Sequence, residues 1–205
     1  MDAGEANRSD PSSKSSPSVN LTENGGPGNS PPASPPAGGW GPLTDRGDLE
    51  MRIARDGTWF YRGSPIGRQP LVKLFGSVLH RESDGSYWLV TPAERGRIAV
   101  EDVPFLAVAL TAEGEGRAQR LIFRTNLDEF VTAGPDNPLR METAASGGPV
   151  PYILVRGGLE ARLARPVFYD LVDLGTEERF EDAAAFGVWS EGMFFRLGEP
   201  GADWE

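Results

Sequence analysis

Two stretches of the chain repeat their apolar residues at the spacing of one face of an α-helix. The first stretch follows Pro70 and consists of Leu71, Leu74, Phe75, Val78 and Leu79. The second runs from about Pro166 to Leu174, and the apolar side chains that it should bury are Phe168, Leu171 and Val172. Because proline suits the first turn of a helix, this pattern predicts two helices with buried apolar faces.

The segments around these helices favour β-strands. Asp56-Gly57 separates an alternating stretch from residues 58–61, which are rich in strand formers, so it predicts a hairpin. Residues 91–94 have the form of a capping box and predict a single helical turn. Further short strands are predicted at 87–90, 105–112, 120–125, 128–132, 139–143, 152–155, 186–189 and 193–197. The predicted fold class is therefore α+β, with mainly antiparallel sheet.

The segments before the two helices resemble each other. Each contains an Arg-Gly pair, Arg62-Gly63 in the first and Arg156-Gly157 in the second, and each places an arginine just before the helix-opening proline. These two arginines are Arg68 and Arg165, although their spacing to the proline differs by one residue. The order predicts two repeated hairpin-plus-helix units, with a ligand site in the cleft between them.

Composition divides the chain into a tail and two domains. Residues 1–41 are rich in glycine, proline and serine and have few large apolar side chains, so they predict a disordered tail. The remainder is predicted to form a β-rich domain at 42–102 and a second at 103–205, each with one helix. The tail lacks the continuous apolar core of a signal peptide, and no later run reaches membrane-spanning length. A soluble cytoplasmic protein without a membrane partner is the simplest interpretation.

Charge and missing residue types exclude several functions. The formal net charge is −10, which argues against a general nucleic-acid surface. The chain has no cysteine and His80 is its only histidine, so zinc–thiolate sites, thiolate catalysis and multi-histidine metal sites are excluded. Neither a Gly-x-Ser-x-Gly motif nor a P-loop occurs. We therefore expect no metal, no cofactor and no catalytic residues, although paired carboxylates from distant segments leave an enzyme open.

Five side chains are candidate ligand contacts. Arg68 and Arg165 stand at the predicted helix starts, where free N–H groups and the helix dipole favour an anion; the alternative for each is an ion pair with an acidic neighbour. Trp59 and Tyr61 can stack on a nucleobase, or they can belong to the core. Asn126 can hydrogen-bond the edge of a base, or it can form a turn.

Several motifs also appear in a familiar order. They are Ile53 to Tyr61, Tyr87 to Pro92, Thr125-Asn126, Val167 to Val172 and Phe186 to Ser190. Together they resemble a bacterial family named domain of unknown function 1285. The resemblance implies a two-domain, β-rich fold with a duplicated core and a C-terminal part loosely similar to pleckstrin-homology domains. It also implies a site for a nucleotide-like ligand at the domain interface and a role in signalling.

Two functions remain at this point. In the first, the protein is a non-catalytic sensor or adaptor that binds an anionic, nucleotide-like molecule between its two domains. In the second, it is a protein-interaction module in which an exposed sheet edge accepts a strand of a partner.

Overall fold

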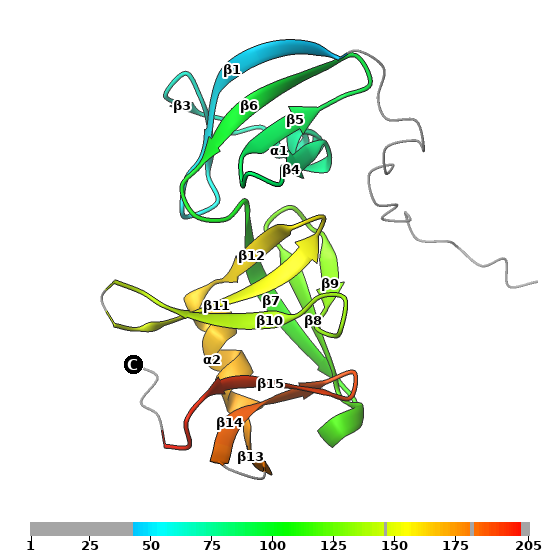
Figure 1. Cartoon of the computed structure of the whole chain (residues 1–205), viewed down its shortest axis with the longest axis vertical. Coiled ribbons are helices and arrows are strands. Elements are labelled where there is room, and N and C mark those ends of the chain that lie inside the picture. Colours follow the sequence, from blue (N-terminus) through cyan, green and yellow to red (C-terminus); the bar gives the residue numbers. More distant parts are fainter. Residues whose placement is uncertain (1–42, 146, 181–182, 202–205) are drawn as a thin grey trace, which may run out of the picture.

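A computed structural model describes residues 43–145, 147–180 and 183–201, and the predicted tail at 1–41 lies outside these ranges. The first domain holds a six-stranded sheet in the order β3-β2-β1-β6-β5-β4. Its strands are β1 (Thr44–Ile53), β2 (Trp59–Tyr61), β3 (Ser64–Pro65), β4 (Leu79–Arg81), β5 (Tyr87–Val90) and β6 (Glu94–Val100). Helix α1 (Gln69–Ser77) connects β3 to β4 and lies beside the sheet (Figure 1).

The second domain holds another six-stranded sheet, in the order β10-β11-β12-β7-β8-β9, and a small sheet in the order β13-β14-β15. The strands of the large sheet are β7 (Phe105–Glu113), β8 (Arg120–Thr125), β9 (Phe130–Thr132), β10 (Leu139–Thr143), β11 (Pro149–Arg156) and β12 (Leu159–Leu163). The small sheet consists of β13 (Thr176–Phe180), β14 (Ala183–Ser190) and β15 (Met193–Gly198), and a 3-10 turn, η1, spans Gly116–Ala118. Helix α2 (Arg165–Asp173) lies between the two sheets (Figure 1).

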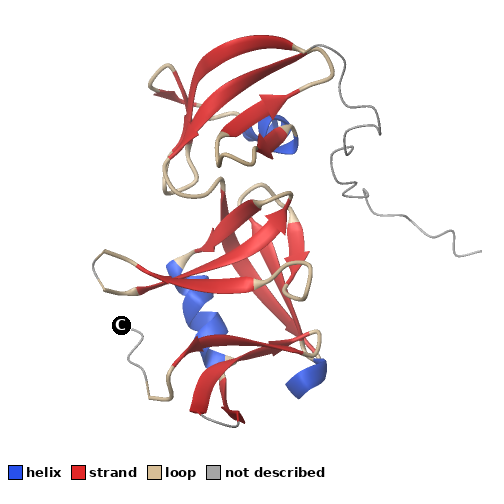
Figure 2. Ribbon diagram, viewed as in Figure 1, coloured by secondary structure: helices blue, strands red, loops and turns tan. Residues whose placement is uncertain are grey.

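The two large sheets share one topology. In each, the first and sixth strands pair in parallel at the centre, β1 with β6 and β7 with β12. All other neighbouring strands in both sheets are antiparallel, and strands dominate the described chain (Figure 2), so the α+β class with mainly antiparallel sheet is confirmed.

The helices occupy different places relative to these sheets. Helix α1 connects the third and fourth strands of its sheet, whereas α2 follows the sixth strand of the other. The predicted repeat of a hairpin-plus-helix unit is therefore not confirmed, because the feature that the two domains share is the strand order. The loose similarity of the C-terminal part to pleckstrin-homology domains stays a prediction.

Helix α1 is shorter than its apolar stripe predicted. It ends at Ser77, and Leu79 lies fully buried in β4, where it pairs with Leu89. The pairing of β4 with β5 is thus favoured over a further turn of α1. The predicted burial of Leu74 is wrong, since this side chain is 58% exposed, whereas Phe75 stacks on Trp59 with ring centroids 6.1 Å apart.

The predicted helical turn at 91–94 is also wrong. The Thr91 hydroxyl accepts a hydrogen bond from the Glu94 N–H at 3.1 Å, as it would in a capping box. The chain nevertheless continues from Glu94 as β6, because residues 94–100 find strand partners on both sides, in β1 and β5.

Gly187 marks a close approach of β14 and β15. A Cβ atom at this position would lie 2.2 Å from the carbonyl oxygen of Phe195, which is backbone and cannot rotate away. Overpacking of this kind typically costs about 1–3 kcal/mol, so we expect Gly187→Ala to lower the free energy of unfolding by that amount in urea denaturation. Gly67→Ala is the control, because nothing lies within 4 Å of its Cβ position. Equal stability of the two variants would contradict the close strand contact.

Candidate ligand site

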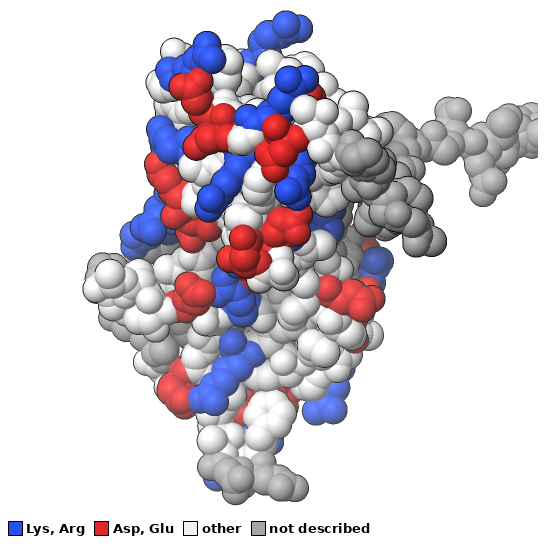
Figure 3. Space-filling view, turned by 45° about the horizontal axis from the view of Figure 1, so that its top comes forward, with Lys and Arg blue, Asp and Glu red and all other residues white. Residues whose placement is uncertain are grey.

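The two domains meet through polar contacts that join backbone and side chains. The Gln69 side chain at the start of α1 donates to the Asn126 carbonyl at 2.9 Å. Arg162 of β12 donates to the Arg55 carbonyl at 2.8 Å, in the hairpin between β1 and β2. Figure 3 shows acidic and basic side chains interspersed over the face in view, in keeping with the many ion pairs of this protein.

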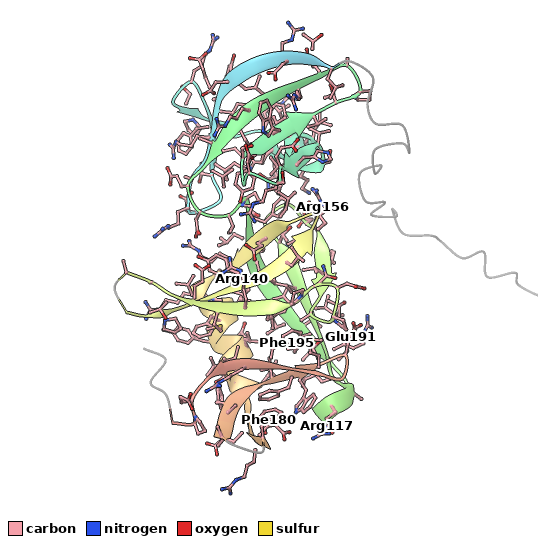
Figure 4. All side chains as sticks on the ribbon, in the orientation of Figure 1. Arg117, Arg140, Arg156, Phe180, Glu191 and Phe195 are labelled. Atoms are coloured by element: carbon pink, nitrogen blue, oxygen red, sulfur yellow. The ribbon has the colours of Figure 1, made fainter. Side chains whose placement is uncertain are left out.

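Arg156, at the end of β11, ties α1 to the second domain. Its Nε and Nη2 atoms donate to the two carboxylate oxygens of Glu129 at 2.9 and 3.2 Å. It also donates to the carbonyls of Gly76, at 2.7 Å, and Leu79, at 3.4 Å. Both charged side chains are largely buried, and Figure 4 shows Arg156 at the end of the second domain that faces the first. Arg156 therefore caps the C-terminus of α1 from the other domain.

Asn126 is a structural residue of the domain interface. Its Oδ1 accepts the Leu106 N–H at 3.1 Å, and its Nδ2 lies 3.5 Å from the Gly57 carbonyl oxygen. Gly57 has a φ of +81°, and a Cβ there would lie 2.7 Å from Asn126 Nδ2. The side-chain amide is thus packed against the first domain, and its contact with the edge of a base stays a prediction.

The two aromatic candidates lie in different environments. Trp59 is 1% exposed and belongs to the core, which agrees with the alternative given for this residue. Its stacking on a nucleobase stays a prediction. Alternation along β2 explains this burial, because Trp59 and Tyr61 share the inner face but only Trp59 is covered by Phe75 of α1. Tyr61 is 46% exposed, and the Arg62 guanidinium lies 5.2 Å from its ring centre.

The two arginines both stand at helix starts, as predicted. Arg68 is the N-cap residue of α1 and Arg165 is the first residue of α2. Both are exposed, and neither forms an ion pair with an acidic residue of the described chain. Arg165 instead donates from Nε to the hydroxyl of Tyr169 at 2.7 Å, one helical turn further on.

A cavity of about 460 Å³ adjoins the start of α2. Its walls come from the hairpin of β10 and β11, from β12 and from α2, and they comprise Ala144, Gly148, Pro149, Val150, Pro151, Arg162, Leu163, Ala164, Arg165, Phe168 and Tyr169. Arg68 is not among these residues, so this cavity does not bring Arg68 and Arg165 together. The lining residue Arg162 contacts the first domain, because it donates to the Arg55 carbonyl.

The cavity has a positive character. Helix α2 has no side-chain N-cap hydrogen bond and no acidic residue in its first turn, so its N-terminal dipole is not neutralised there. Arg165 adds a full charge. Arg162 forms an ion pair with Asp102, whose Oδ2 lies 3.4 Å from Arg162 Nη1. An anion in the cavity would therefore be attracted by the charge of Arg165 and by the N-terminal dipole of α2.

Asp102 also holds the connection between the domains in place. It follows β6 and accepts a hydrogen bond from the Tyr152 hydroxyl at 3.1 Å. Burial, and then the charge of Asp102, raise the pKa of Tyr152 to about 12. The hydroxyl therefore stays protonated at neutral pH and donates to Asp102.

The described side chains that line the cavity are apolar, aromatic or basic. Among the described residues that line it, none is a histidine, aspartate, glutamate, serine or threonine; Ser146, in the same hairpin, lies outside the described residues. Within the described ranges, no group of three or more histidine, aspartate or glutamate side chains could hold a metal ion. Sequence reasoning missed Arg162 and Tyr169, and the signal for Tyr169 was its position one turn after Arg165, on the same helix face.

The fold and this cavity define a two-domain, β-rich protein with a positively charged pocket at a helix start. The chain belongs to the DUF1285 family. It matches the model of the N-terminal domain of unknown function (DUF1285) over residues 35–103 and that of the C-terminal domain over residues 104–197. No curated protein matches it. None of the described helices has both the length and the apolar character needed to cross a membrane.

Two solved structures are similar to this chain. A DUF1285 family protein from Silicibacter pomeroyi DSS-3 is 48% identical, with a TM-score of 0.73, over 82% of this chain and 88% of that one. A DUF1285 family protein from Shewanella baltica OS155 is 28% identical, with a TM-score of 0.50, over 62% of this chain and 91% of that one.

Proposed function

We propose that this protein is a non-catalytic sensor or adaptor that binds a small anionic, nucleotide-like molecule in the cavity beside the start of α2. The observation that carries the proposal is the grouping of Arg165, an uncapped helix start and Tyr169 around one cavity. The cavity volume of about 460 Å³ falls within the ~300–1,000 Å³ range of ligand pockets.

The anionic part of the ligand is assigned to the start of α2. Free backbone N–H groups of a first helical turn and an arginine are a common combination for binding phosphate or carboxylate. Because Arg165 has no carboxylate partner among the described residues, no existing ion pair has to break when the anion binds.

A flat, apolar part of the ligand has a matching wall. Pro149, Pro151 and Tyr169 line the same cavity, and the Tyr169 side chain is 39% exposed. Stacking of a base on an aromatic ring is worth about 1–3 kcal/mol and tolerates different bases. This wall supports a nucleotide-like molecule over inorganic phosphate alone.

Arg162 supplies a route from the cavity to the first domain. It lines the cavity, and it also donates to the Arg55 carbonyl and pairs with Asp102 in the connection between the domains. A ligand that changes the position of Arg162 would change these contacts. This coupling is the basis for proposing a signalling role.

Calorimetric titration of the full chain with adenosine monophosphate tests the proposal. A charge-assisted hydrogen bond is worth about 1.5–3 kcal/mol, so we expect Arg165→Ala to weaken binding about tenfold to a hundredfold. Arg68→Ala is the matched control, because it removes the same side chain from the start of the other helix, outside this cavity. The control should bind as the unmodified protein does.

The other outcomes are equally informative. Equal weakening by Arg68→Ala and Arg165→Ala would favour a single site that both arginines share between the domains, and would place the ligand elsewhere. Unchanged binding in both variants, or no binding of adenosine monophosphate and inorganic phosphate to the full chain, would overturn the proposal.

A second candidate function, binding of a partner strand, is favoured by the edge strand β9. Phe130, its first residue, is 63% exposed, and β9 ends the second sheet with one side unpaired by the described strands. Peptides selected for binding to the full chain should lose affinity for Phe130→Ala if they extend this edge. Unchanged affinity would show that the peptides do not pair with β9.

A further inference from the structure

A second cavity, of about 240 Å³, opens between α1 and the first sheet. Most of its walls are apolar, and they come from α1, from the four strands β1, β2, β5 and β6 and from residues that directly follow α1 and β5: Leu49, Met51, Tyr61, Phe75, Val78, Leu89, Thr91 and Gly96. Met51 and Leu89 are core residues at 6% exposure, so the cavity reaches the hydrophobic core of the domain. An apolar group that enters it would remove apolar surface from water, which is favourable by about 25 cal/mol per Å².

Three charged side chains also line this cavity, those of Arg46, Glu94 and Arg95. Arg46 pairs with Glu94, and Arg95 pairs with Asp45, so the four charges balance. The Nε atom of Arg46 donates to Glu94 at 2.7 Å, and no described residue accepts a hydrogen bond from its two Nη atoms. Arg95 donates to Asp45 from Nε at 3.2 Å and lies over the Trp88 ring.

These features complement a molecule with an apolar tail and a carboxylate head. The Nη atoms of Arg46 can donate two parallel hydrogen bonds to a carboxylate, a geometry that favours arginine over lysine. The cavity is smaller than the ~300–1,000 Å³ pockets that hold drug-sized ligands, so the tail must be short. An apolar cavity of about 150 Å³ is already large enough for benzene.

We propose that the cavity between α1 and the first sheet binds a small monocarboxylic acid with an aliphatic tail. The tail lies among Met51, Val78 and Leu89, and the carboxylate contacts Arg46. This site differs from the one beside α2 in its domain and in its lining residues.

Calorimetric titration of the full chain with octanoate tests this inference. We expect saturable binding that weakens about fourfold for each methylene removed from the acid, because each buried methylene contributes a similar transfer free energy. Arg46→Ala should weaken octanoate binding about tenfold, the effect of losing a charge-assisted hydrogen bond. Octan-1-ol, which lacks the carboxylate, should bind equally well to the unmodified protein and to Arg46→Ala.

Substitutions at Val78 test the cavity itself. Val78→Phe should abolish octanoate binding by filling the space, and Val78→Leu, a milder change that preserves the fold more easily, should weaken it. Arg165→Ala is the control and should leave octanoate binding unchanged, just as Val78→Leu should leave binding of adenosine monophosphate unchanged.

Three results would overturn the inference: no saturable binding of octanoate, unchanged affinity in both Val78 variants, or loss of octanoate binding in Arg165→Ala. Because the two ligands and the two sets of variants are independent, failure of this site leaves the site beside α2 unaffected, and the reverse also holds.

Discussion

Arg156→Ala is expected to lower the free energy of unfolding by about 3–5 kcal/mol, the typical cost of removing one partner of a buried ion pair. The substitution leaves the Glu129 carboxylate, whose side chain is 16% exposed, without its two-point partner. It also removes the donor to the carbonyls of Gly76, in the last turn of α1, and of Leu79, at the start of β4. Urea denaturation followed by circular dichroism measures this loss.

Lys73→Ala is the matched control for Arg156→Ala. Lys73 also pairs across the domain boundary, with Asp128, but both side chains are more than 40% exposed. Solvent screens such a pair, so we expect the stability of this variant to stay close to that of the unmodified protein. An equal loss of stability in the two variants would contradict the claim that burial makes the Arg156 ion pair contribute more than the Lys73 ion pair.

Trp59→Ala is expected to cost about 3–5 kcal/mol, the range for removing a large aromatic side chain from a packed core. Trp59 is almost fully buried and stacks on Phe75, so its removal leaves a cavity between β2 and α1. Trp59→Phe should cost much less, because the buried Nε1 atom of Trp59 has no hydrogen-bond partner among the described residues. Thermal and urea unfolding of both variants measure the difference.

Tyr61→Ala is the control in the same strand. Tyr61 is about half exposed, so its truncation should change the stability by no more than about 0.5 kcal/mol. If Trp59→Ala folded with unchanged stability but lost binding of adenosine monophosphate, Trp59 would be a ligand contact and its assignment to the core would be wrong.

Strands with β-branched and aromatic residues were predictable from the sequence, and the predicted ranges 87–90 and 120–125 agree with β5 and β8. Strand β12 was missed although its residues alternate between buried and partly exposed. Its leucine, glutamate, alanine and arginine residues are strong helix formers, so local propensity opposes the strand. Pairing with β11 and β7 decides its structure, and this pairing is tertiary.

The candidate site could be predicted only in part, because tertiary packing also determines which side chains line it. Arg68 and Arg165 have similar sequence contexts, and both helix starts were predicted correctly. Only Arg165 lines the cavity, because the hairpin of β10 and β11 lies against the start of α2. Alternation likewise places Trp59 and Tyr61 on one face of a strand, but the packing of α1 determines which of them is covered.

The most direct test of the proposed function is a map of backbone amide chemical shifts in the full chain during titration with adenosine monophosphate. We predict that the largest changes fall on Arg165, Val167 and Tyr169, in the first turns of α2, with little change at Gln69 and Leu71 in α1. Changes centred on α1, or an even scatter over both domains without saturation, would contradict the placement of an anion site beside α2.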